Sequence, residues 1–178
     1  IRSLAQSLIV NPMVIANFGF LGEDPNEYTA AYIPDDDFLV NRVSFPAVYS
    51  PRNAPPGQFL VQAEITSAPG GEVMHWTDDR VTSHVLPGLV ERGLAPDQTP
   101  VLVSIERYSR AYIVYDTDYD SRLETVLEWF KARSIYPHGR FGSHSYLNVD
   151  GCVRQSAELA RALGRPISDS DLAQFFDR

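Results

Sequence analysis

The chain has few of the features that mark secreted, membrane or nucleic-acid-binding proteins. Its 178 residues contain one cysteine, Cys152, which excludes an internal disulfide and suits a reducing compartment. No apolar run reaches the ~18 residues that a membrane-spanning helix needs. Lys and Arg number 15 against 23 Asp and Glu, a net charge of -8, whereas phosphate binding needs a basic surface. We therefore expect a cytoplasmic globular protein that does not bind nucleic acid and has no membrane span.

The motifs of metal-dependent and nucleophilic enzymes are also missing. The 4 histidines show no His-x-x-x-His spacing, and Asp35-Asp36-Asp37 has no suitably spaced further ligand. We therefore predict a solvated turn at these aspartates and no metal site. Ser143 and Ser145 lack the Gly-x-Ser-x-Gly pattern of a nucleophile elbow. Gly-x-Gly-x-x-Gly does not occur either, so the chain contains no dinucleotide-binding loop. Catalytic residues stay unassigned.

What the chain does contain is a series of strand patterns interrupted by helix patterns. Residues 59–65 alternate apolar and polar side chains, as a half-buried strand does. We expect further strands at 4–20, 28–33, 40–45, 101–105 and 111–115, with a short one before the last helix. Helices are expected at 77–92, with a kink or break at Pro87, behind the capping box Ser121-Arg122-Leu123-Glu124, and after Asn148. This order predicts an α+β fold with a mixed, mostly antiparallel sheet flanked by about three helices.

The last expected helix has a defined start and end. Asn148 is a good N-cap, and Asp150 lies in the first turn, where the helix dipole favours an anion. Gly164 supplies the C-terminal stop, with Pro166 just beyond. Apolar residues recur at helical spacing in Val149, Val153, Ala157, Ala160 and Leu163. By itself, this pattern favours an ordinary turn leading into a capped helix.

Two short motifs at this helix carry a resemblance to a known family. Gly139-Arg140-Phe141-Gly142, followed by Tyr146-Leu147-Asn148-Val149-Asp150, resembles the C-terminal flavin motif of a superfamily. That superfamily includes flavin-containing amine oxidases, protoporphyrinogen oxidase and UDP-galactopyranose mutase. The resemblance implies that the final helix contacts FAD, and that the cofactor-binding residues are Gly139, Arg140, Asn148, Val149 and Asp150. Val149 departs from the usual Met, and His144 stands where the mutases often have Tyr.

The same resemblance suggests three substrate-binding residues. Asn41-Arg42-Val43 is similar to the mutase segment whose arginine faces a nucleotide-sugar diphosphate. The segment Ala111 to Asp116 resembles one that carries a substrate-contacting tyrosine, here Tyr112. Tyr146 matches the tyrosine just before the flavin helix. The resemblance implies that Arg42, Tyr112 and Tyr146 converge on one cleft. The alternative is that Arg42 is a surface pairing residue and both tyrosines are core aromatics.

These expectations divide the chain by role. Residues 1–133 are expected to form the substrate-side sheet domain, 134–165 the flavin-contacting loop and helix, and 166–178 a C-terminal tail. We expect the substrate-side and FAD-contacting portion of a flavin-dependent, amine oxidase-like oxidoreductase. The N-terminal dinucleotide-binding half would then be a partner within the same enzyme, and a small molecule or nucleotide sugar the substrate.

Two alternatives remain open at this point. The first is that the chain is part of a UDP-galactopyranose mutase-like flavoenzyme. The second is that it is a stand-alone, non-catalytic binding domain. Because the glycine-rich loop is missing and the first residue is Ile1, we expect a fragment that alone is inactive and binds no FAD.

Overall fold

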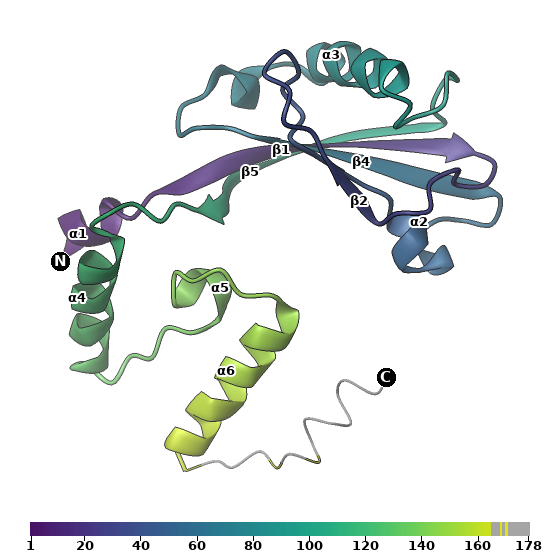
Figure 1. Ribbon diagram of the computed structural model, residues 1–178. Helices are drawn as coiled ribbons and strands as arrows, with labels where there is room; N and C mark the ends of the chain where they lie inside the picture. Colours follow the sequence, from purple (N-terminus) through teal and green to yellow (C-terminus); the bar gives the residue numbers. More distant parts are fainter. Residues whose placement is uncertain (165–167, 169, 171–178) are drawn as a thin grey trace. The chain divides into compact units, whose positions relative to one another are not determined.

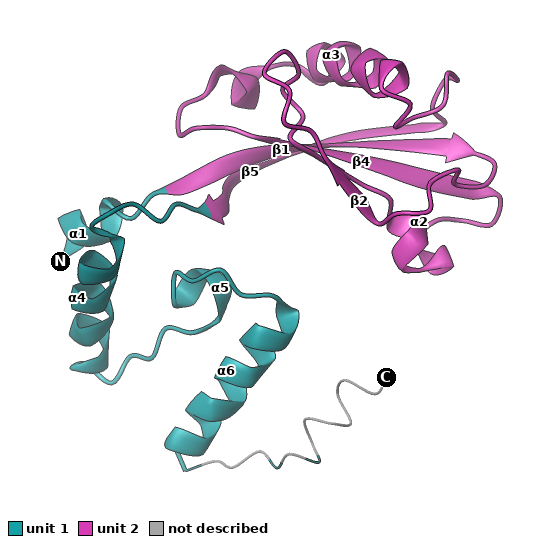
Figure 2. Ribbon diagram, in the orientation of Figure 1, with its two compact units in different colours: residues 1–9, 113–178 teal, residues 10–112 magenta. Residues whose placement is uncertain are grey.

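A computed structural model describes residues 1–164, 168 and 170 (Figure 1). The chain divides into two compact units, which are residues 10–112 and residues 1–9 with 113–178 (Figure 2). The two units are defined by which residues contact one another, whereas the domains expected from the sequence were defined by function. The functions assigned to those domains stay a prediction. Pro166 and, apart from Ser168 and Ser170, the tail expected at 166–178 lie outside the described residues.

The unit of residues 10–112 is built on a five-stranded sheet with the strand order β2-β3-β4-β1-β5. Adjacent strands pair antiparallel in β1 with β4, β2 with β3, and β3 with β4. Strand β5 also runs antiparallel to β1, because Val101 N–H donates to Gly19 O and Val114 N–H donates to Ile9 O. The strands are β1 (Val10–Leu21), β2 (Ala30–Tyr32), β3 (Arg42–Ser44), β4 (Gln58–Thr66) and β5 (Leu102–Ile113). The expected α+β class is confirmed.

The long strand β5 corrects one expectation. The sequence predicted two strands, at 101–105 and 111–115, whereas the structure has one continuous strand. Residues 101–114 of this edge lie against residues 9–19 of β1, so β5 carries extra residues, as a bulged strand does. Each extra residue moves the side chains that follow it to the other face of the sheet. Apolar and polar residues then no longer alternate regularly along β5, so its sequence does not show the usual strand pattern.

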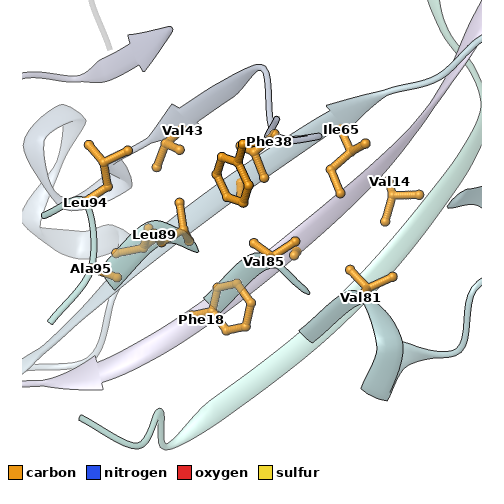
Figure 3. Packing of buried hydrophobic residues seen from close by; sticks show 14 of the residues in the cluster. Val14, Phe18, Phe38, Val43, Ile65, Val81, Val85, Leu89, Leu94 and Ala95 are labelled. Carbon is orange, nitrogen blue, oxygen red and sulfur yellow. The ribbon is translucent and has the colours of Figure 1, made fainter. Parts of the chain in front are cut away.

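One face of the sheet is closed by helix α3 (Asp78–Glu91). Thr77 caps this helix as expected, with its Oγ1 accepting a hydrogen bond from Arg80 N–H at 3.2 Å. The helix continues through Pro87 without the expected division into two pieces. Val81, Val85 and Leu89 of α3 are fully buried and pack with alternate residues of the strands (Figure 3), which include Val14, Phe18, Val43 and Ile65.

Short helical segments complete this unit. They are α2 (Pro46–Tyr49), the 3-10 turn η1 (Pro51–Asn53) and the 3-10 turn η2 (Glu72–His75). Asp35 and Asp37 are exposed, as the expected turn requires, and both pair with Arg92, which follows α3.

The second unit is helical. Its elements are α1 (Arg2–Gln6), α4 (Tyr119–Lys131), α5 (Gly139–Gly142) and α6 (Val149–Ala162). Residues 2–6 are therefore helical rather than extended, and no strand forms at 134–137. Helix α4 begins at Tyr119, so Ser121 and Glu124 lie inside its first turns and form no capping box. The expected glycine-bearing loop contains one helical turn, α5.

Helix α6 has the predicted bounds but a sparsely buried apolar face. Asn148 is its N-cap, and Gly164 follows its end with a φ of 75° that glycine adopts without strain. Of the apolar residues expected on its buried face, only Ala157 is buried, while Val149 is 75% exposed and Leu163 55% exposed.

Candidate functional site

The sheet has a second face, opposite α3, that carries polar side chains. Arg42 on β3 lies directly across from Glu64 on β4, and Tyr32 on β2 lies across from Arg42 on its other side. One pleat further along, Gln62 Nε2 donates to Asn17 Oδ1 at 2.9 Å. Residues that oppose one another in register share a face. We call this surface, defined by Asn17, Arg42, Ser44, Gln62, Glu64 and Tyr112, the polar face.

Arg42 is the cation of the polar face, and it has both an acidic and a polar partner there. Its Nη1 lies 3.6 Å from Glu64 Oε1, and its Nη2 donates to Ser44 Oγ at 3.1 Å. Burial alone lowers the pKa of Arg42, but the attraction of Glu64 and Tyr112 and a hydrogen bond with Tyr112 outweigh it and raise the pKa. Its Nε is buried and has no hydrogen-bond partner among the described residues. Arg42 therefore keeps its charge and one donor that no described group accepts.

Glu64 is the acidic partner, and the sequence search missed it. Its side chain is 8% exposed, and burial raises the pKa of its carboxyl, with Arg42 opposing the rise. The 3.6 Å separation from Arg42 is too long for a short charge-assisted hydrogen bond, which explains why burial wins. A signal existed, because Glu64 is a charged residue in the alternating run 59–65, and a buried carboxylate requires a cation.

Tyr112 interacts with Arg42, and a substrate-binding role for either residue stays a prediction. Strands β3 and β5 are three positions apart in the sheet, about 14 Å at about 4.8 Å per strand. A contact between the two side chains therefore requires both to lie along the sheet surface rather than to project from it. Tyr146 belongs to the other compact unit, so its convergence with Arg42 and Tyr112 stays a prediction.

The motif residues Gly139 and Arg140 form the start of α5. Gly139 has a φ of 74°, a left-handed conformation in which a Cβ would be strained, so glycine is required there. Its N–H donates to Gln155 Oε1 of α6. The Arg140 guanidinium lies 4.2 Å from the centre of the Tyr146 ring, and Nη1 donates to Leu147 O at 3.4 Å. Arg140 thus braces the segment between α5 and α6, and a contact with the cofactor stays a prediction.

The start of α6 is accessible. Asn148, Val149 and Asp150 are all exposed. Asn148 has the extended backbone of an N-cap, yet its side chain makes no capping hydrogen bond. The first N–H groups of an α-helix have no partner within the helix, and they carry partial positive charge. These residues therefore fit a group with a partly negative edge, such as the one that the resemblance implies.

Residues 1–164, 168 and 170 contain no group of three or more His, Cys, Asp or Glu side chains that could hold a metal ion. Cys152 is a half-buried free thiol on α6. Among the described helices, none combines the length and the apolar character that crossing a membrane would require.

Comparison with known proteins supports the fold. No protein family matches the sequence, and no curated protein matches it either. A crystal structure of reduced UDP-galactopyranose mutase superposes with a TM-score of 0.77 at 19% identity, covering 96% of this chain and 37% of that one. A protoporphyrinogen oxidase-like protein from Exiguobacterium sp. 255-15 gives a TM-score of 0.67 at 18% identity, covering 89% of this chain and 35% of that one.

A third structure, of a protein from Pyrococcus furiosus, gives a TM-score of 0.55 at 15% identity over 96% of this chain and 36% of its own. The resemblance noted in the sequence is thus confirmed at the level of the fold. The chain spans just over a third of the length of these three structures.

Proposed function

We propose that this chain is the substrate-side and C-terminal FAD-contacting portion of a flavin-dependent oxidoreductase, of the amine oxidase-like kind. The observation that carries the proposal is the place of the flavin-like motif. Residues 148–150 form the exposed start of α6, in a chain whose fold matches that of reduced UDP-galactopyranose mutase over 96% of its length. The dinucleotide-binding half, whose glycine-rich loop this chain lacks, would be supplied by the rest of the polypeptide.

The start of α6 would stabilise charge on the cofactor. Flavin, when bound, supplies the electron transfer, and its reduced ring carries negative charge at the N1–C2=O edge. The N–H groups after Asn148, with the helix dipole behind them, would favour that charge because they are oriented before the reaction begins. Asp150 would hold the helix start in place. Gly139 permits the turn that precedes it, and Arg140 supports that turn through Tyr146.

The polar face would supply the substrate contacts. Arg42 offers donors in a planar fork, which suits a carboxylate or phosphate. Tyr112 would orient the same anion through its hydroxyl. Glu64 beneath them is buried, so it would fix the Arg42 side chain along the sheet.

A second candidate is a mutase acting on a nucleotide sugar. The contact between Arg42 and Tyr112 favours it, because an arginine with a tyrosine hydroxyl is a fitting pair for a diphosphate. A stand-alone binding domain remains the non-enzymatic alternative. The expected partners are the dinucleotide-binding half and a small-molecule or nucleotide-sugar substrate.

Substitutions at the start of α6 in the full-length polypeptide test the proposal. Asn148→Ala with Asp150→Ala should raise the dissociation constant for FAD or shift the reduction potential of the flavin. The control is Asp79→Ala, which removes an exposed first-turn acid from α3. Each loss of a first-turn acid costs about 0.3–1 kcal/mol of stability, so unfolding curves of all variants must accompany the titration. Unchanged FAD affinity and potential in the double variant would reject the proposal.

A further inference from the structure

Two tyrosines near the start of α4 hold the segment that leads into α6. Tyr115 Oη accepts a hydrogen bond from the N–H of Tyr146 at 2.6 Å. Tyr119 Oη donates to the carbonyl oxygen of His144 and lies 3.4 Å from its Nδ1. The two tyrosine rings pack edge to face with centres 4.6 Å apart, so they form one support. Neither tyrosine belongs to the flavin-like motif.

The supported segment, residues 143–148, needs such a support because its backbone is strained. His144 has a φ of 47°, in the left-handed region that side chains with a Cβ rarely adopt. Such a conformation persists only where surrounding contacts determine it. The Tyr119 hydroxyl meets the carbonyl of this same residue, and the Tyr115 hydroxyl holds the amide two residues later.

Burial distinguishes the two tyrosines. Tyr119 is 4% exposed, while Tyr115 is 53% exposed. If the hydroxyl were removed, water would therefore replace its hydrogen bond more readily at Tyr115 than at Tyr119. Burial, with smaller contributions from Tyr115 and Asp120, raises the pKa of Tyr119 to about 12. Its hydroxyl is therefore a constant hydrogen-bond donor at any pH near neutrality.

We propose that Tyr115 and Tyr119 are positioning residues, which fix the direction of residues 143–148 and so aim the first N–H groups of α6 at the flavin. The inference rests on the proposed function, because it assumes that α6 contacts the cofactor. It assigns a role to two side chains that lie outside the flavin-like motif and act on it through residues 143–148.

The experiment uses the full-length polypeptide with Tyr119→Phe, Tyr115→Phe and the control Tyr49→Phe. Each change removes one hydroxyl and keeps the ring, so the fold is retained, and near-ultraviolet circular dichroism checks it. Tyr49 is 59% exposed on α2. The first measurement is amide hydrogen exchange over residues 143–150 in the cofactor-free protein. The second is the dissociation constant for FAD.

We expect Tyr119→Phe to speed exchange in this segment about tenfold and to raise the FAD dissociation constant about tenfold. Tyr115→Phe should change both by about threefold, and Tyr49→Phe should leave both within about twofold. Exchange that is unchanged in Tyr119→Phe would overturn the inference. Faster exchange with unchanged FAD affinity would also overturn it, while leaving the proposed function standing. A wild-type protein that binds no FAD would reject the proposed function and this inference with it.

Discussion

The two compact units differ in what holds them in shape. The sheet unit buries whole side chains of Phe18, Phe20, Phe45 and Leu89 between its strands and α3. In the described part of the helical unit, the buried apolar side chains are few, namely Ile113, Tyr119, Val126 and Ala157. Several large apolar side chains there stay half exposed or more, such as Phe141 at 51% and Tyr146 at 50%.

This difference predicts that the sheet unit is more stable than the helical unit. Buried apolar area is the main favourable term in folding, so the sheet unit carries most of the stability that this chain can supply. The helical unit is ordered instead by hydrogen bonds and ring contacts, which open locally at lower free energy. The candidate cofactor residues lie in this second kind of structure. Functional residues commonly lie on connecting segments that a rigid scaffold positions.

The largest expected effect tests this comparison with one residue type in both units. Phe18→Ala leaves a cavity between β1 and α3 and should lower the free energy of unfolding by about 3–5 kcal/mol. Phe141→Ala, at a half-exposed site of α5, should lower it by less than about 1 kcal/mol. Urea unfolding of both variants measures the difference. Similar losses at the two sites would show that the helical unit has a core of its own.

A matched pair of helix glycines gives the next largest effect. A Cβ at Gly88 of α3 would lie 2.4 Å from Phe38 Cε2, so Gly88→Ala overpacks the core and should cost about 1–3 kcal/mol. At Gly151 of α6, the nearest atom would be Leu147 Cδ2 at 3.4 Å, an ordinary contact. Gly151→Ala should therefore stabilise the protein, by up to about 1 kcal/mol through helix propensity. Thermal unfolding measures whether each variant is stabilised or destabilised. A gain in stability for Gly88→Ala would contradict the packing described for α3.

The smallest expected effect concerns the pH dependence contributed by Glu64. Burial raises the pKa of this carboxyl, and Arg42 offsets only part of the rise. The folded protein therefore binds this proton at a higher pH than the unfolded chain does. The contribution of Glu64 to the free energy of unfolding should thus increase as pH falls from the raised pKa toward the ordinary Glu value, and be constant below it.

The difference in unfolding free energy between the wild type and Glu64→Gln, followed from pH 7 to about pH 4, isolates this contribution. Glu91→Gln, at a side chain that is 82% exposed, is the control. If the unfolding free energy of the wild type falls relative to that of Glu64→Gln on acidification, the Arg42 contact and not burial dominates the pKa of Glu64.

Much of the sheet unit could be predicted because its signals are local. Alternation in residues 59–65 gave the position of β4, and the capping residue Thr77 gave the start of α3. Strand β5 was missed as one element because its bulged edge interrupts the alternation. The start of α4 was placed too late because Ser121 and Glu124 match a capping pattern, whereas the helix starts at the buried Tyr119.

The candidate site was less predictable, because its contacts join residues far apart in the chain. Resemblance to a family suggested Arg42 and Tyr112, but strand register decides that Glu64 lies beside Arg42. Resemblance also gave the motif at α6, yet the support by Tyr115 and Tyr119 depends on how the chain turns after α5. Neither feature leaves a pattern at short spacing, so each needed a three-dimensional structure.

The most direct measurement is a crystal structure of the full-length polypeptide with FAD bound. We expect N–H groups of residues 149–151 to lie within about 3.2 Å of the N1–C2=O edge of the flavin. A flavin bound with its ring away from the start of α6 would contradict the proposal that this helix contacts the cofactor.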